Sequence, residues 1–111
     1  MDSVEYPEFI RKLPQADLPF EGMTGFLIQG ESGQVVLFES EVEAHVPAHS
    51  HGSQWGVVTG GKMDLRIGED LRTYLPGDCY FIAAGTEHEA KIYPGFKCVD
   101  VFEDTDRYHP K

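Results

Sequence analysis

The sequence has few basic residues and no long apolar run. Nine lysines and arginines stand against nineteen aspartates and glutamates, which gives a formal net charge of −10. Proteins bind nucleic acids and anionic membranes through clustered lysine and arginine, and the sequence has no such cluster. Its apolar runs, such as that at 35–38, are far shorter than the roughly 20 residues of a membrane-spanning helix. We therefore expect a soluble protein with no nucleic-acid or membrane partner.

Cysteine is also scarce, with only Cys79 and Cys98 in the chain. The N-terminal stretch carries acidic residues where a secretory signal has basic ones, and it lacks an apolar segment. These features predict a cytoplasmic location. In that compartment two cysteines are more often buried thiols than a disulfide, so we expect both to be free and buried.

Helix-forming patterns are absent as well. Twelve glycines and seven prolines divide the chain into short pieces, and no stretch shows sustained amphipathic helical spacing. Residues 7–13 could form one or two helical turns or an extended arm. From residue 26 onward, short β-rich runs follow one another. They are expected at 26–30, 34–39, 42–46, 55–59, 62–67, 71–75, 79–83, 88–93 and 96–102.

The clearest of these runs is KMDLRIG, where Met63, Leu65 and Ile67 fall on one face of a strand. Such alternation indicates a strand with one face against a core. Eight or nine strands without intervening helices indicate an all-β fold, an antiparallel sandwich or barrel. A chain of 111 residues can bury one core. We predict an arm at 1–25, one barrel domain at 26–103 and a tail at 104–111.

The aromatic residues form two groups. Four phenylalanines are expected in the core of the barrel: Phe26, Phe38, Phe81 and Phe102. Three others fit a pocket rim or a dimer face about as well as ordinary packing. These are Trp55, Tyr74 and Tyr80.

The stretch HSHGSQWG at 49–56 contains two of the five histidines. Residues two apart in a strand point the same way, so His49 and His51 would lie on one side, about 7 Å apart along the backbone. We interpret Gly52-Ser53 as a two-residue hairpin loop, which would place Gln54 opposite His51 on the same face. This interpretation predicts a cluster of two imidazoles and one amide, with Trp55 pointing away.

Such a cluster could bind a metal ion. Imidazole suits Ni, Zn, Fe, Mn and Cu, and glutamine can ligate only through its neutral carbonyl oxygen, so the residue types do not identify the metal. Two histidines at this spacing are also common as solvent-facing strand residues, and the spacing alone leaves both interpretations open.

A second stretch, PGDCYFIAAGTEHEAKIY at 76–93, contains another histidine in a strand–turn–strand setting. Together the two stretches resemble the cupin superfamily, whose motifs are G-x5-H-x-H-x3,4-E-x6-G and G-x5-P-x-G-x2-H-x3-N. The first motif matches at His49, His51, Gln54 and Gly61. The second matches at Gly77, Gly85 and His88.

The sequence departs from these motifs at several positions. Glu43 replaces the first glycine, Ala83 the proline and Ile92 the final asparagine, and the loop after His51 is one residue shorter than usual. Glutamine in place of glutamate is similar to a minority variant of small single-domain cupins, which include a pectin-degradation type acting on unsaturated uronates. The tail sequence Asp106-Arg107-Tyr108 also resembles small bacterial cupin-2 proteins.

The resemblance implies a jelly-roll barrel in which His88 completes a metal site with His49, His51 and Gln54. It implies a homodimer and a small-molecule substrate. Three functions follow as expectations. One is Lewis-acid isomerisation or ring opening of a carbonyl, sugar-acid or enol-type substrate, the second is a small dioxygenase, and the third is a binding module without catalysis. The motif region offers no acid or base beyond the ligands themselves. His45 and His109 are expected at the surface.

Overall fold

This computed structural model describes residues 5–111 of the chain. Within them it contains nine strands and one short helix. The helix α1 spans Glu8–Arg11. The strands are β1 (Met23–Gln29), β2 (Gln34–Ser40), β3 (Ala44–His49), β4 (Gln54–Gly60), β5 (Met63–Ile67), β6 (Asp70–Tyr74), β7 (Cys79–Ile82), β8 (His88–Ile92) and β9 (Phe96–Phe102).

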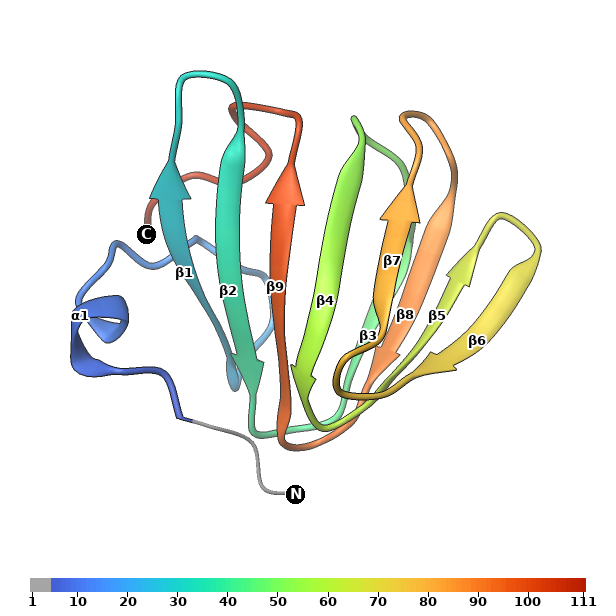
Figure 1. Cartoon of the computed structure of the whole chain (residues 1–111), viewed down its shortest axis with the longest axis horizontal. Coiled ribbons are helices and arrows are strands. Elements are labelled where there is room, and N and C mark those ends of the chain that lie inside the picture. Colours follow the sequence, from blue (N-terminus) through green and yellow to red (C-terminus); the bar gives the residue numbers. More distant parts are fainter. Residues whose placement is uncertain (1–4) are drawn as a thin grey trace.

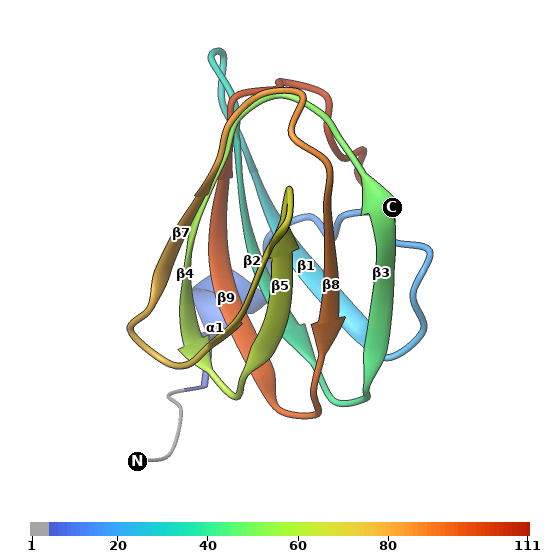
Figure 2. The same cartoon turned by 90° about the vertical axis from the view of Figure 1, so that its right-hand side faces the viewer.

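The strands form two antiparallel sheets that face each other (Figures 1 and 2). The five-stranded sheet has the order β1-β2-β9-β4-β7, and the four-stranded sheet has the order β3-β8-β5-β6. Consecutive strands β3 and β4 therefore lie in different sheets. The predicted all-β jelly roll is confirmed.

The core fills the space between the two sheets. On β5, Met63 and Leu65 are buried while Asp64 and Arg66 point outward, as the alternation predicted. The buried core residues are Leu27, Val36, Phe38, Val58, Met63, Leu65, Tyr80, Ile82, Ala90, Ile92, Phe96, Cys98 and Phe102. In the described residues, no helix is long and apolar enough to cross a membrane.

All nine predicted strands are present, with shifted ends. β1 begins at Met23, directly after Gly22, whose φ of 84° turns the chain into the sheet. β3 covers Ala44–His49 rather than 42–46 because Ser40 bonds the backbone of Val42 in the preceding turn. This shift leaves His49 at the end of a strand, next to the connection between the sheets.

Three glycines of the resemblance, Gly61, Gly77 and Gly85, all adopt left-handed backbone conformations, with φ of 66°, 95° and 80°. Residues with a Cβ rarely adopt these values, so the motif spacing marks where the chain must reverse. At Gly61 a Cβ would also lie 2.8 Å from the backbone of Gly95, which leaves no room for a side chain.

Two core predictions are wrong, for one reason. Phe81 is 61% exposed and Cys79 is exposed, because both point outward from β7 while Tyr80 and Ile82 point inward. Both faces of this strand carry apolar residues, so alternation alone did not show which face meets the core. Cys79 and Cys98 are free, as predicted, and Cys98 is buried.

The other three phenylalanines are buried as predicted. Phe38 and Phe102 belong to the core between the sheets. Phe26 instead lies beneath the N-terminal segment, where the ring of Tyr6 packs edge-on at 6.1 Å and Arg11 lies 5.3 Å above the ring.

The segments outside the barrel strands are joined to it by backbone hydrogen bonds. Gln15 bridges to Phe26 of β1, and Ala16 bridges to Pro110 of the tail. The arm and the tail therefore lie side by side against one margin of the barrel.

Replacing Phe96 by alanine tests the position of the core. Phe96 is 2% exposed, so the truncation leaves a cavity and we expect a loss of about 3–5 kcal/mol in the free energy of unfolding. Phe9→Ala is the control, because Phe9 is 75% exposed, and we expect a change within about 0.5 kcal/mol. Chemical denaturation of both variants measures the difference, and equal losses would contradict this placement of the core.

Candidate metal centre

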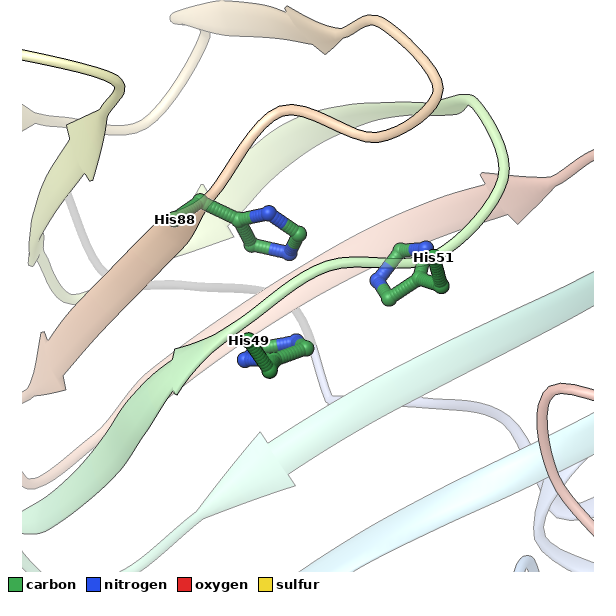
Figure 3. A group of neighbouring side chains, drawn as sticks. All are labelled: His49, His51 and His88. Carbon is green, nitrogen blue, oxygen red and sulfur yellow. The ribbon is translucent and has the colours of Figure 1, made fainter.

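Three histidines from two segments of the chain lie close together (Figure 3). His49 ends β3, His88 begins β8, and these two residues are paired across the antiparallel strands. His51 follows in the loop at 50–53. One ligand nitrogen from each of the three lies within 4.8 Å of the others. The structure thus brings together all three histidines that the two motifs singled out.

The predicted hairpin after His51 is wrong. Strands β3 and β4 belong to different sheets, so residues 50–53 cross between sheets instead of reversing one strand onto the next. The backbone N–H of Gly52 donates to the Asp104 carboxylate at 2.8 Å, and a Cβ at Gly52 would lie 2.6 Å from that carboxylate. A side chain at Gly52 would displace the Asp104 carboxylate, so a close contact and not a left-handed turn favours glycine here.

Each imidazole is held by a hydrogen bond from Nδ1 to a nearby main-chain carbonyl. His49 bonds Pro47 at 2.8 Å, His51 bonds Gly52 at 2.8 Å, and His88 bonds Thr86 at 2.9 Å. A carbonyl oxygen only accepts, so each Nδ1 carries the proton and each Nε2 keeps its lone pair. Metal-ligating histidines are oriented in this way.

The buried Nε2 of His88 has no hydrogen-bond partner within residues 5–111. Leaving a buried polar atom unpaired costs free energy, so such an atom calls for an explanation. A metal ion accepts the lone pair of imidazole, and the donor set of three histidines fits a divalent transition ion. Three histidines this close together suggest a metal site.

Burial keeps the imidazoles of His51 and His88 neutral. Burial first, together with the nearby His49, His51 and Arg107, lowers the pKa of His88 to about 4. Burial is also the main cause that lowers the pKa of His51. The neutral form is the one that can bind a metal ion.

Gln54 begins β4 on the opposite sheet and lines the same cavity as the histidines. Its side chain hydrogen-bonds the Asp100 carboxylate and thereby favours the ionised form of that acid. Because a carboxylate only accepts, the amide nitrogen donates, and the amide carbonyl oxygen is the atom of Gln54 that could ligate a metal ion. The cluster of imidazoles and amide thus arises from two facing sheets, not from one hairpin.

Asp100 is the residue that the sequence interpretation missed. It points inward from β9, is 5% exposed, and accepts a hydrogen bond from the Tyr80 hydroxyl at 2.5 Å. Burial raises the pKa of Asp100 to about 6. Opposite it stands Gly56, where a Cβ would collide with Asp100 and Tyr80. A signal was present, because Asp100 occupies an inward position in the alternating run FKCVDVF.

The site opens into a cavity of about 380 Å³. Its wall includes the histidines, Gln54 and Asp100 together with Arg107 and Tyr108 from the tail. The guanidinium of Arg107 lies 4.7 Å from the Tyr108 ring, and its buried Nε has no hydrogen-bond partner in the described chain. The tail therefore brings one positive charge to the site.

The other two histidines lie at the surface, as predicted. His45 is exposed on β3, and its Nε2 lies 2.8 Å from the Glu89 carboxylate. His109 is exposed in the tail, where its backbone carbonyl accepts from Asp17.

No protein-family model and no curated protein matches the sequence. Solved structures do match. An RmlC-like cupin from Shewanella frigidimarina is 18% identical with a TM-score of 0.78, and the match covers 96% of this chain and 97% of that one. KdgF from Halomonas sp. is 21% identical with a TM-score of 0.73, covering 82% of this chain and 87% of that one.

This chain has the cupin fold. A third similar structure is the oxalate decarboxylase of Bacillus subtilis, a protein with Mn(II) centres. It is 16% identical with a TM-score of 0.73, and the match covers 87% of this chain and 29% of the decarboxylase chain. The fold that the two motifs implied is confirmed.

The low pKa of His88 predicts a pH dependence of stability in the metal-free protein. Its pKa is about 4 when folded and about 6.5 when unfolded, so the unfolded state binds more protons between these values. The contribution of His88 to stability is therefore complete above about pH 6.5 and is lost as the pH falls toward 4. We expect a loss of up to about 3 kcal/mol across this window.

Asp100 has a raised pKa, so its contribution to stability falls as the pH rises, opposite to that of His88. The wild type is therefore compared with His88→Gln, which keeps Asp100 and removes only the titration of His88. Denaturant titrations of both chelator-treated proteins at pH 4.5 to 7.5 give the difference in the free energy of unfolding. That difference should shrink as the pH falls. A difference that is independent of pH would contradict a neutral, buried His88.

Proposed function

We propose that this cupin is an enzyme that binds one divalent transition metal ion through Nε2 of His49, His51 and His88 and the amide oxygen of Gln54. The observation that carries the proposal is the arrangement of the three imidazoles. Each Nδ1 is hydrogen-bonded to a main-chain carbonyl, and the ligand nitrogens lie close together. The Nε2 of His88 is buried and has no hydrogen-bond partner in the described residues. Ni, Zn, Fe, Mn and Cu all suit this donor set. The Mn(II) centres of the similar oxalate decarboxylase support a metal-binding role.

The substrate is proposed to be a small anion. Arg107 brings a guanidinium with an unpartnered Nε to the cavity wall, in a chain whose net charge is −10. A guanidinium binds carboxylates through directional, charge-assisted hydrogen bonds. Arg107 would thus hold the anionic group of the substrate beside the three histidines. A sugar acid or an oxo acid has the required chemistry.

Asp100 is proposed to move a proton between itself and the bound substrate. Its carboxyl group lies in the cavity wall, and the Tyr80 hydroxyl and the Gln54 amide fix its orientation. A group with a pKa near 6 can act as acid or base near neutral pH. A bound divalent ion would supply Lewis acidity toward a carbonyl or enediol oxygen. Proton transfer of this kind serves isomerisation, ring opening or elimination.

Metal content tests the site. In protein purified without a histidine tag and loaded with each candidate metal in turn, we expect about one ion per chain, as in other mononuclear sites. His49→Ala and His88→Ala should bind less than about a tenth of that, because removing one ligand leaves an incomplete set. His45→Ala is the matched control, since His45 lies on the same strand but is exposed. Equal metal content in all four proteins would refute the assignment.

Turnover of small carboxylates tests the chemistry. The metal-loaded protein is mixed with unsaturated uronates and 2-oxo acids without oxygen, and products are followed by NMR. We expect turnover of at least one compound and a kcat at least about 100-fold lower in Asp100→Asn, whose metal content stays unchanged. Arg107→Gln should raise KM by about 10-fold or more, because it removes the charge that binds the anion. Arg72→Gln is the control, because Arg72 is exposed and paired with Asp70.

Other results would favour the two alternatives. Turnover that needs oxygen would indicate a dioxygenase and contradict the proton-transfer role of Asp100. Metal binding without turnover of any compound would favour a binding module.

A further inference from the structure

The cavity beside the histidines is lined by two kinds of side chain. Polar ones are in part bonded to one another, because Tyr80 and Gln54 both donate to Asp100. Much of the remaining wall is hydrocarbon. Its apolar side chains include Leu18, Phe20, Met23, Val46, Ile92 and Phe96. A molecule that fills this cavity therefore meets polar groups at a few points and hydrocarbon over much of its surface.

Two of these apolar side chains come from the N-terminal segment. Leu18 and Phe20 lie in the stretch before β1, outside the barrel strands, and both are only partly buried. Leu18 packs against the core, whereas Phe20 belongs to the cavity wall and not to the core cluster. The ring of Phe20 is therefore available to a bound molecule.

The C-terminal tail supplies the opposite kind of group. Arg107 brings its guanidinium to the wall, and the ring of Tyr108 next to it packs edge-on against Phe38 and Phe102, at 5.8 and 5.4 Å. The buried amide of Gln34 donates to the carbonyl oxygen of Tyr108 at 2.8 Å and accepts from its N–H at 3.0 Å. These contacts fix the tail, and with it Arg107, against the barrel.

The two terminal segments are also joined to each other. The backbone N–H of Asp17 donates to the carbonyl of His109 at 2.8 Å, and the N–H of Lys111 donates to the carbonyl of Gln15 at 2.7 Å. The positive charge of the tail and the apolar side chains of the N-terminal segment therefore belong to one connected part of the cavity wall.

We propose that these two segments select the substrate, and that the substrate is a carboxylate with an apolar group, such as a 2-oxo acid with an aryl or branched alkyl chain. This inference rests on the proposed function, because it takes Arg107 as the group that binds the carboxylate. Arg107 holds the charged end beside the histidines, and Leu18 and Phe20 contact the apolar end.

A sugar acid suits this wall less well. Its hydroxyl groups lose their bonds to water on entry, and each one left without a new partner costs free energy. The side chains of Leu18, Phe20 and Val46 carry no hydrogen-bonding group, whereas burying an aryl or alkyl group against them is favourable. Room is sufficient, since a cavity of roughly 150 Å³ already holds benzene and this one measures about 380 Å³.

Three carboxylates test the inference on the wild type. Propanoate, 3-phenylpropanoate and D-glucuronate are each titrated by calorimetry into the zinc-loaded protein. We expect 3-phenylpropanoate to bind at least about 10-fold more tightly than the other two, because only it buries an aromatic ring. Glucuronate that binds as tightly as 3-phenylpropanoate would overturn the inference. This comparison needs no variant and so does not depend on the folding of one.

A substitution in the N-terminal segment tests where the selection occurs. Phe20→Ser should weaken the binding of 3-phenylpropanoate at least about 5-fold and leave that of propanoate within about 2-fold, because only the longer ligand reaches the ring. Phe9→Ser is the matched control and should bind both as the wild type does, since Phe9 is 75% exposed and is not part of the cavity wall. Wild-type affinity of Phe20→Ser for 3-phenylpropanoate would contradict selection by this segment.

Arg107→Gln separates this inference from the proposed function. It should weaken propanoate and 3-phenylpropanoate by the same factor, at least about 10-fold, because it removes the charge that binds both. If Arg107→Gln keeps the wild-type affinities, or if the wild type binds no carboxylate, the proposed anion site itself is wrong. If the wild type binds propanoate and 3-phenylpropanoate equally, the anion site stands and only the apolar selection is wrong.

Discussion

The candidate site depends on three hydrogen bonds from histidine Nδ1 to main-chain carbonyls. The acceptors at Pro47, Gly52 and Thr86 lie within two residues of the histidines that they orient. The tautomer of each ring is therefore set by the local backbone, whereas the convergence of His49 and His88 is set by the pairing of β3 with β8. Without these bonds the rings could rotate or exchange tautomers, and no shared set of lone pairs would exist.

A second set of polar contacts joins the metal site to the opposite sheet. Burying the Asp100 carboxylate is costly, and the bonds from Tyr80 and Gln54 offset part of that cost. Gly56 makes the arrangement possible, because a side chain there would occupy the same space. An apolar residue at position 100 would give a simpler core. A buried carboxylate in the cavity wall fits the proton-transfer role proposed for Asp100.

The sequence predicted the strands through their period-two alternation, which is a local rule. It predicted the three histidines through the resemblance of two motifs, whose glycines Gly61, Gly77 and Gly85 do adopt left-handed backbone conformations. The pairing partner of a strand is not local, so the hairpin assigned to Gly52-Ser53 was wrong although Gln54 still faces the cavity. Phe81 was misplaced because alternation defines two faces and does not identify the core when both are apolar. Asp100 was visible as an inward charge but lay outside both motifs.

The misplaced Phe81 and the missed Asp100 have a common origin in the five-stranded sheet. On three of its strands, a residue of the cavity is followed directly by an exposed apolar residue: Gln54 by Trp55, Tyr80 by Phe81 and Asp100 by Val101. Successive residues of a strand point to opposite faces, so the same backbone positions both sets. The backbone of β4, β7 and β9 therefore fixes the inward side chains of the site and the exposed apolar side chains together, so a strand cannot shift its register on one face without displacing the residues on the other.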